Sequence, residues 1–210
     1  RLRGFRVVWH DSVEAALQLT NGHAHIFSNE LPDAFPCHIF QKTEHGWMEL
    51  HLRIADGKIS EQLVSASLPE SSVFDYPHPI GQRVEIHQSY RRWLEAWAPH
   101  WMSGAILTID YGDLSRTLYH RRPAGSLRGY AVQQRLSGND VFQNPGFCDM
   151  TADVNFTDLE KWGTDLGWST ETSSTLLAFL KEQGAAGSLS VHFLEAGEAF
   201  RVLIQRRPSK

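Results

Sequence analysis

The sequence predicts an α/β fold, and three observations lead to this prediction. Short apolar segments with strand character alternate with amphipathic segments of helical period along the 210 residues. One segment, residues 105–112 (AILTIDYG), has the mostly apolar run of a buried strand. The sequence has no internal repeat and no low-complexity tract. We therefore expect a sheet covered by helices, in which ligands bind beyond the carboxyl ends of the strands.

The composition is that of an ordinary globular chain. Hydrophobic residues make up 41% and charged residues 21%, which is enough for one sizeable core. The net charge of −4 gives no support for nucleic-acid binding. No apolar run approaches the roughly 20 residues that span a bilayer. Two cysteines, Cys37 and Cys148, do not make a disulfide framework, so a reducing compartment is expected.

The first elements are a strand, a helix and a second strand. Residues 5–10 (FRVVWH) form a β-prone run that stops at Asp11-Ser12, and these two residues can cap a helix over residues 13–19. The Asn-Gly pair at 21–22 is a turn signal. Residues 24–28 (AHIFS) are then the second strand.

A meander and an aromatic helix follow. Residues 36–66 contain two turn signals and apolar residues of period two, which predicts antiparallel strands. A proline-bearing loop follows it, and the region 40–85 is interpreted as a β-meander and loop insertion. Residues 87–101 carry tyrosine, tryptophan and leucine side chains on one stripe, as in a helix with a buried face.

The C-terminal half continues the alternation after the buried strand. Residues 113–150 are rich in arginine and are expected to be an irregular insertion. Residues 156–168 and 174–184 are predicted helices, the second of which stops at a glycine. Residues 188–207 have two alternating runs around Ala196-Gly197, which predicts a C-terminal antiparallel hairpin.

Polar pairs stand at the carboxyl ends of three of the predicted strands. These pairs are Asp11-Ser12, Asn29-Glu30 and Asp110-Tyr111. Each also has a purely structural interpretation, as a helix cap, a turn and a strand-end cap, respectively. Their common position at strand ends is the first indication of a site.

Five segments resemble the signature segments of a known family. They are SNELPDAFPCHIFQ, GAILTIDYGD, GSLRGY, NPGFCDMTADVNFTDL and GEAFRVLIQRR. In this order they resemble the MidA/NDUFAF7-type S-adenosylmethionine-dependent methyltransferases, from about Phe5 to Arg206. The NE-x-x-DA-x-P and IDYG elements are the most specific, whereas GSLRGY alone is weak.

The resemblance implies a class I, Rossmann-like methyltransferase sheet of strand order 3-2-1-4-5-7-6. On this mapping residues 5–10 are strand 3, residues 24–28 strand 4 and residues 105–112 strand 5, and the closing hairpin supplies strands 6 and 7. Residues 1–210 would then be a partial methyltransferase domain, from strand 3 onward.

The sequence departs from the family because residues 1–210 contain no segment that resembles strands 1 and 2. The glycine-rich cofactor loop after strand 1 and the acidic residue after strand 2 would both precede Arg1. Without these strands the sheet would have a gap of roughly 14 Å. We therefore expect residues 1–210 to be the C-terminal part of a longer enzyme, unable to bind cofactor normally by itself. In TADVNF, the family usually has His and Asp at the positions of Asp153 and Asn155.

The resemblance also implies the activity and the cofactor, S-adenosyl-L-methionine. Some members methylate an arginine of a respiratory complex I subunit and so assist its assembly. A carboxylate can hold a guanidinium bidentately, so Glu30 and Asp33 are the candidate catalytic residues, with Asn29 orienting the substrate or the cofactor. Asp11 and Ser12 are candidate cofactor-binding residues, with Asp11 on the adenine amino group. The candidate substrate-binding residues are Asp110, Tyr111, Glu85, Asp149 and Thr151.

Several alternatives stay open. A non-catalytic assembly protein could keep the same fold, and a small-molecule methyltransferase is a third option. Glu85 can be a structural ion-pair partner, Asp33 can cap a short helix, and Asp149 and Thr151 can cap the helix that follows them. The 11 histidines lack metal-site spacing, so no metal is expected.

The expected partner is a protein substrate, such as a respiratory complex subunit, with neither nucleic acid nor a membrane span. The arginines of residues 113–135 can be a solvated face or can dock an acidic partner. The oligomeric state is open, with a homodimer as one option. The expected compartment is the bacterial cytoplasm or the mitochondrial matrix.

Overall fold

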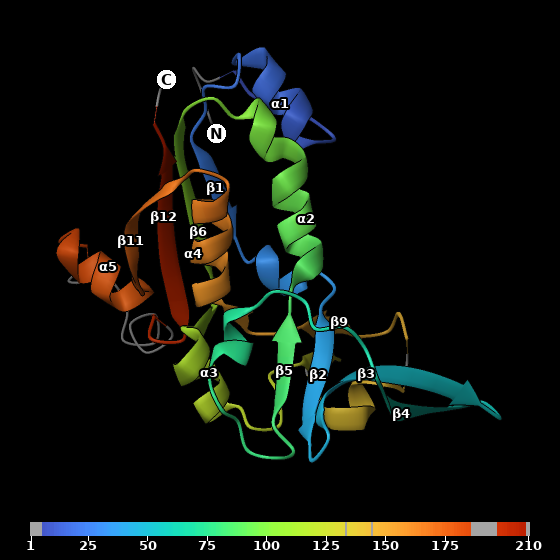
Figure 1. Ribbon diagram of the computed structural model, residues 1–210. Helices are drawn as coiled ribbons and strands as arrows, with labels where there is room; N and C mark the ends of the chain where they lie inside the picture. The colour runs from blue at the N-terminus through green and yellow to red at the C-terminus, as the bar shows by residue number, and fades with distance from the viewer. Residues whose placement is uncertain (1–5, 133, 144, 186–196, 209–210) are drawn as a thin grey trace.

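A computed structural model describes residues 6–132, 134–143, 145–185 and 197–208. Its main sheet lies above two smaller sheets in Figure 1. The strands of the main sheet are β1 (Ile26–Asn29), β6 (Gly104–Asp113), β12 (Phe200–Arg207) and β11 (Ser169–Thr175), in this spatial order, with β10 (Val154–Asn155) beside the end of β6. β1 is parallel to β6, whereas β12 is antiparallel to both β6 and β11. This arrangement has the expected order of strands 4, 5, 7 and 6, but the place expected for strand 6, the first strand of the closing hairpin, is taken by β11.

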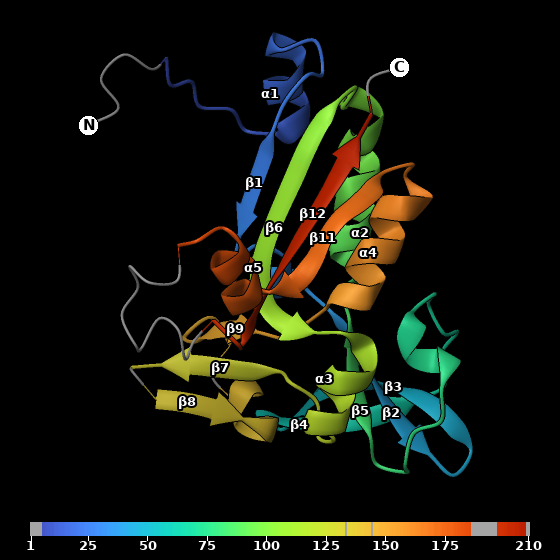
Figure 2. The same cartoon turned by 90° about the vertical axis from the view of Figure 1, so that its left-hand side faces the viewer.

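Helices cover both faces of the main sheet. α2 (Gln88–Trp97) and α4 (Phe156–Asp165) cover one face, and α5 (Leu176–Glu182) lies on the other (Figure 2). The stripe predicted for α2 is buried at Tyr90, Leu94 and Trp97, and a 3₁₀ turn, η3 (Ala98–His100), continues it. Trp97, Trp101 and Trp168 pack against one another in this core, with ring centroids 5.1–6.0 Å apart.

The meander predicted over residues 36–66 is confirmed. Its strands are β2 (His38–Thr43), β3 (Gly46–Ala55) and β4 (Lys58–Val64), and β5 (Arg83–Ile86) joins them in the order β4-β3-β2-β5. Asp56 and Gly57 both have positive φ, at 50° and 70°, which is the backbone of a two-residue hairpin turn. A second core lies here, built from Phe40, Val84, Leu118 and their neighbours.

The region 113–150 was expected to be irregular, and this expectation is wrong. It contains α3 (Ser115–Arg121), β7 (Arg128–Ala131), β8 (Gln134–Ser137), the 3₁₀ turn η4 (Gly138–Phe142) and β9 (Asp149–Thr151). The three strands form a sheet of order β8-β7-β9. Such short strands carry little periodic signal, and their pairing depends on contacts between residues distant in sequence.

One strand prediction needs correction, and another falls outside the described residues. Residues 6–10 form no strand, and Trp9 is 91% exposed, because the described residues place no neighbouring strand beside them to accept their hydrogen bonds. The first strand of the predicted hairpin falls in residues 186–196, outside the described residues. Within them, β12 pairs with β11, a strand that the sequence analysis did not predict.

The remaining elements connect these layers. They are α1 (Val13–Leu19) and the 3₁₀ turns η1 (Pro32–Ala34) and η2 (Ser72–Asp75). α1 lies beside the amino-terminal end of β1 (Figure 2). In the described ranges no helix is long and apolar enough to cross a membrane.

Candidate functional site

The carboxyl ends of β1 and β6 lie side by side, and this edge builds the candidate site. Asn29 is paired in register with Ile109, and the Glu30 amide donates a hydrogen bond to the Ile109 carbonyl at 2.9 Å. Asp110 and Tyr111 come directly after Ile109 within β6. The two polar pairs predicted at the ends of these strands are therefore neighbours, as expected for parallel strands.

Glu30 has an unusual backbone conformation. Its φ is +47°, in the left-handed region, which costs a non-glycine residue on the order of 1 kcal/mol or more. The Asn29 side-chain amide donates to a carboxylate oxygen of Glu30 at 3.3 Å, and both side chains are exposed. This sharp turn ends β1 and leaves an amide and a carboxylate facing solvent at the strand end.

Asp110 is fully buried and holds the loop that follows β1. One of its carboxylate oxygens accepts from the Asp33 amide at 3.1 Å, and the other accepts from the Tyr111 amide at 2.7 Å. Burial, reinforced by the negative charge of Asp33, raises the pKa of Asp110 to about 8. Asp110 is therefore largely neutral near pH 7 and positions Asp33 through its backbone.

Asp33 has one carboxylate oxygen bonded and one without a partner. The Thr151 hydroxyl donates to Oδ2 at 2.7 Å, and the Ala152 amide donates to the Asp33 carbonyl at 3.3 Å. Oδ1 is buried and has no hydrogen-bond partner among the described residues. A buried carboxylate oxygen left in this way is an acceptor for a donor group from outside the described chain.

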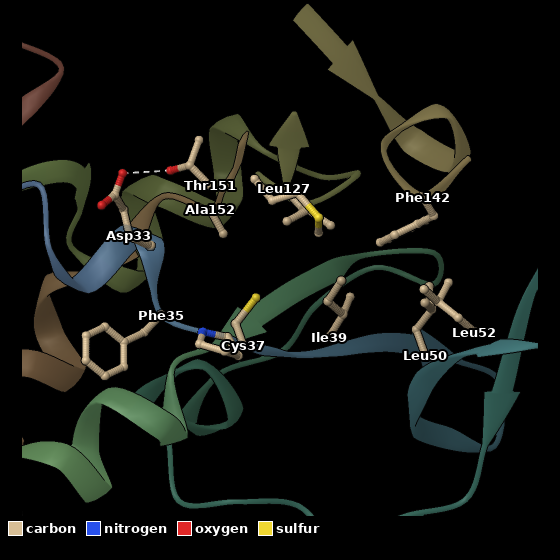
Figure 3. Close-up of a pocket in the computed structure, with 13 residues that line it drawn as sticks. Asp33, Phe35, Cys37, Ile39, Leu50, Leu52, Leu127, Phe142, Thr151 and Ala152 are labelled. Carbon is tan, nitrogen blue, oxygen red and sulfur yellow. Dashed lines mark hydrogen bonds between the residues drawn. The ribbon is translucent and has the colours of Figure 1, made fainter. Parts of the chain in front are cut away.

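A largely apolar pocket of about 370 Å³ adjoins Asp33 (Figure 3). Asp33 and Thr151 lie at one end of it, whereas Phe142 and Leu52 lie at the other. Its apolar lining also includes Ile39, Leu50, Leu127 and Met150. Cys37 also lines this pocket, and burial raises the pKa of its thiol to about 12, so the thiol is protonated at neutral pH.

Tyr111 follows Asp110 on β6, so its side chain points to the other face of the sheet. Its ring packs on Phe200, with ring centroids 3.9 Å apart, and the Arg128 guanidinium lies 5.6 Å from the ring centroid. Burial, together with the charge of Glu30, raises the pKa of Tyr111. Tyr111 is therefore protonated at neutral pH and can donate a hydrogen bond.

Glu85 is buried away from the strand edge. Its carboxylate accepts from the Ser126 amide at 2.7 Å, the Ser126 hydroxyl at 3.0 Å and the Leu127 amide at 3.2 Å. Glu85 thus anchors the loop before β7 through hydrogen bonds, in place of the ion pair considered from the sequence. The carboxylate of Asp149 is exposed and makes no hydrogen bond or ion pair with the described residues.

Asp11 and Ser12 are also separate from the strand edge. The Ser12 hydroxyl accepts from the Ala15 amide at 3.1 Å and so caps α1. Because α1 lies by the amino-terminal end of β1, the polar pair at 11–12 does not join the other two (Figure 2).

Sequence reasoning missed a buried ion pair close to the site. The Arg128 guanidinium lies 2.5 Å from Asp153 Oδ1, and both side chains are more than nine-tenths buried. The departure from the family pattern at Asp153 was the only sequence signal for it. Among the described residues, no histidine, cysteine, aspartate and glutamate side chains are grouped to hold a metal ion.

The sheet order and the polar strand edge define the chain as an α/β protein of the class I methyltransferase type. A profile of the family described as "Putative S-adenosyl-L-methionine-dependent methyltransferase" matches residues 2–174. The chain therefore belongs to this family.

Relatives and a crystal structure agree with this assignment. A zebrafish (Danio rerio) protein named mitochondrial protein arginine methyltransferase NDUFAF7 is 29% identical over 90% of this chain and 43% of its own length. The Xenopus tropicalis protein of the same name is 30% identical over 73% of this chain and 34% of its own length. The chain thus spans less than half the length of these relatives. A Burkholderia thailandensis protein, crystallised with S-adenosyl-homocysteine, shares the fold at a TM-score of 0.74 and 24% identity, over 88% of this chain and 54% of that one.

Proposed function

We propose that this chain carries the substrate side of a methyltransferase that transfers a methyl group from S-adenosyl-L-methionine to an arginine nitrogen of a protein. The buried Oδ1 of Asp33, which has no hydrogen-bond partner among the described residues and belongs to the loop that starts at Glu30, carries the proposal. A guanidinium offers several N–H donors in a planar fork, which suits two neighbouring carboxylates. The names of the relatives, protein arginine methyltransferases, support the choice of acceptor.

The residues at the strand edge fit the chemistry of the cofactor. They offer acceptor oxygens from Asn29, Glu30 and Asp33, and S-adenosylmethionine carries a positive sulfonium and an α-ammonium group. When bound, it supplies an electrophilic methyl group for in-line displacement. Because Ser12 caps α1 away from this edge, we assign Ser12 to helix capping and give Asp11, its neighbour in sequence, no part in the strand-edge site.

The residues of this chain would then position the acceptor. Thr151 fixes one oxygen of Asp33, which leaves the other for the substrate, and Asp110 holds the Asp33 backbone. Glu30 would take the second edge of the guanidinium. Methylation of a guanidinium releases one proton, and the exposed Glu30 carboxylate can receive it and pass it to water. Positioning supplies most of the catalysis in this proposal.

The names of the relatives support a proposal for the compartment and the partner. Their names place them in mitochondria, which agrees with the mitochondrial matrix as one of the two compartments expected from the sequence. A subunit of a respiratory complex is the substrate that this compartment favours. A bacterial cytoplasmic enzyme of the same family remains the second form of the proposal.

Calorimetric titration tests the cofactor part of the proposal. S-adenosylmethionine and S-adenosylhomocysteine are titrated into the 210-residue chain and into the longest product that its gene encodes. We expect binding to the longer form, since the residues here cover one side of the cofactor. If both forms are folded and neither binds either compound, the enzyme proposal is wrong and a non-catalytic assembly protein takes its place.

A carboxylate variant tests the assignment of the acceptor. In the cofactor-binding form, Asp33→Asn should lower kcat/KM for an arginine-containing protein substrate by about 30-fold or more, because a charge-assisted hydrogen bond is lost. Asp56→Asn, in the distant β3–β4 turn, is the matched control and should leave kcat/KM unchanged. Equal activity of Asp33→Asn and the wild-type protein would contradict the role of Asp33.

A further inference from the structure

A second pocket, of about 260 Å³, opens beside the carboxyl end of β6 and is lined by arginines. Its charged lining consists of Arg121, Arg122, Arg128, Arg135, Asp113 and Asp153. Four guanidinium groups therefore face two carboxylates. The whole chain has a net charge of −4, so this positive charge is a local feature of the pocket.

The two carboxylates of the pocket are already shared. Asp153 pairs with Arg128 at 2.5 Å and with Arg122 at 3.2 Å. Asp113 pairs with Arg121 and with Arg201, both at 3.0 Å. Since each carboxylate serves two arginines, the ion pairs leave positive charge unbalanced around the pocket.

Arg128 and Arg135 differ most in how firmly their guanidinium groups are held. Arg128 is 7% exposed, and it is held in one orientation by Asp153, the Ser126 carbonyl and the Tyr130 hydroxyl. Arg135 is exposed, and its guanidinium makes no ion pair or hydrogen bond with the residues that the structure describes. The pocket thus combines one preorganised guanidinium with one that is free to meet a ligand.

The pocket adjoins the candidate site through Tyr111. This residue lines the pocket and directly follows Asp110, and the Arg128 guanidinium lies 5.6 Å from its ring centroid. Apolar lining comes from Leu118, Ala199 and the aromatic rings of Tyr111 and Tyr130. Such a lining suits a carboxylate carried on a short alkyl stem better than a bare inorganic anion.

We propose that this arginine-lined pocket binds an acidic side chain of the protein substrate, close in sequence to the residue that receives the methyl group. The proposal rests on the proposed function, and it adds a preference for substrates with aspartate or glutamate beside the acceptor arginine. Positive charge in the pocket and negative charge at Glu30 and Asp33 would then orient the substrate, because each end attracts the opposite charge.

Peptide binding tests the proposal without any need for cofactor or turnover. Fluorescence anisotropy is measured with the 210-residue chain and a labelled peptide that has one arginine flanked by glutamates, and with the same peptide carrying glutamines instead. We expect the glutamate peptide to bind about fivefold to tenfold more tightly, as a few partly exposed ion pairs allow. The preference should shrink as salt is added.

A pair of matched double variants locates the effect. Arg121→Gln with Arg135→Gln should reduce the preference to less than about twofold. Arg53→Gln with Arg92→Gln makes the same change of net charge outside the pocket and should keep the preference. Thermal denaturation of both double variants checks that they are folded.

Three results would overturn the inference. One is equal affinity of the wild-type chain for both peptides. Another is an equal loss of preference in the two double variants, which would mean a general charge effect. The third is that pyrophosphate displaces both labelled peptides equally while their affinities do not differ, which would mean that the pocket does not distinguish glutamate from glutamine. A preference for the glutamate peptide in a protein without methyltransferase activity would leave this inference standing and remove the proposed function.

Discussion

Asp33 connects three segments that are far apart in the sequence. Its amide donates to Asp110 on β6, its carboxylate accepts from Thr151 on β9, and the residue itself follows β1. Each contact holds the side chain in place, so that Oδ1 keeps its position although it has no partner among the described residues. A carboxylate positioned in this way is preorganised for a donor.

The contact between Thr151 and Asp33 gives the first prediction. Thr151→Val removes the hydroxyl at nearly constant volume and leaves both carboxylate oxygens of Asp33 without a hydrogen-bond partner in the described part of the chain. We expect the free energy of unfolding to fall by about 1–3 kcal/mol, measured by urea denaturation. Thr164→Val, whose hydroxyl donates to the Glu160 carbonyl on an exposed helix face, should change it by less than about 0.5 kcal/mol. Equal effects of the two variants would contradict a special role for Thr151.

The raised pKa of Asp110 gives the second prediction. The pKa is about 8 in the folded protein against 3.8 for a free carboxyl, so the folded state binds the extra proton and loses stability as the pH rises from about 4 to about 8. His87 acts in the opposite sense at acid pH, because burial lowers its pKa from 6.5 to about 4 and stability is lost as the pH falls through that range.

Above pH 6.5, Asp110 still makes stability depend on pH, whereas His87 no longer does. We expect Tm to fall between pH 6.5 and 8, by an amount that corresponds to at most about 1.4 kcal/mol per pH unit. In Asp110→Asn, which cannot ionise, the slope of Tm against pH should be smaller, even if the variant is less stable throughout. Identical slopes in the two proteins would show that Asp110 is already ionised at pH 6.5.

At the residue scale, sequence reasoning identified side chains but not their partners. Asn29, Glu30, Asp33 and Asp110 lie together because the ends of parallel strands meet at one edge, a rule that needs no coordinates. The bond between Asp33 and Thr151 joins residues 118 apart, and no local pattern encodes such a contact. The structural roles of Glu85 and Asp153 depend in the same way on distant loops.

At the element scale, the loop before β7 shows how one buried carboxylate fixes a backbone. Glu85 on β5 accepts three hydrogen bonds from Ser126 and Leu127. Gly125 precedes them with a φ of +84°, and a Cβ at this position would overlap Glu85 Oε1. The loop leads directly to Arg128, so its conformation also sets the position of the arginine-lined pocket.

A glycine substitution tests this anchoring. Gly125→Ala combines an unfavourable φ with an overlap against a buried side chain, and we expect a loss of about 2 kcal/mol or more in the free energy of unfolding. Gly81→Ala is the matched control, because Gly81 has a φ of +89° and open space around its Cβ position. It should cost only about 1 kcal/mol, the conformational part alone. Similar losses in the two variants would mean that Glu85 yields easily to the added methyl group.

Elements with strong local signals were predicted, and those without were not. α2 has a stripe of large apolar residues, and the Asp56-Gly57 turn has the sequence that its positive φ values demand. β11 is rich in serine and threonine, so it has little hydrophobic pattern, and β12 and α4 define it by packing. Residues 6–10 show the reverse case, since a strand-like composition forms no strand without a neighbour.

At the scale of the whole molecule, two hydrophobic cores must be held together. One core lies under α2 and α4, and the other lies between the meander and α3. Asp158, in the first turn of α4, belongs to the first layer but bonds to the second. It accepts from the Ser71 hydroxyl at 2.6 Å and from the Ser72 amide at 2.7 Å, at the start of η2. The site lies where these two layers meet, because Asp33 follows β1 and leads into β2.

Asp158 therefore tests whether the two layers unfold as one unit. It is 2% exposed, and burial raises the pKa of its carboxyl, so the two serine contacts are what stabilise it there. Asp158→Asn places an amide NH₂ against one of two donors, and we expect the free energy of unfolding to fall by about 1–3 kcal/mol. Asp165→Asn, at an exposed i,i+4 pair with Lys161 on the same helix, should cost less than about 0.5 kcal/mol.

Two spectroscopic signals, compared during unfolding, show whether the two layers of Asp158→Asn unfold together or separately. The main core contains Trp97, Trp101 and Trp168, whereas the meander contains Trp47, so tryptophan fluorescence and far-ultraviolet circular dichroism weigh the two layers differently. In a single cooperative unit both signals of Asp158→Asn shift to the same lower urea midpoint. Separate midpoints would show that the meander layer unfolds alone once Asp158 is changed. The strand edge with Asp33 would then depend on this one carboxylate for its coupling to the meander layer.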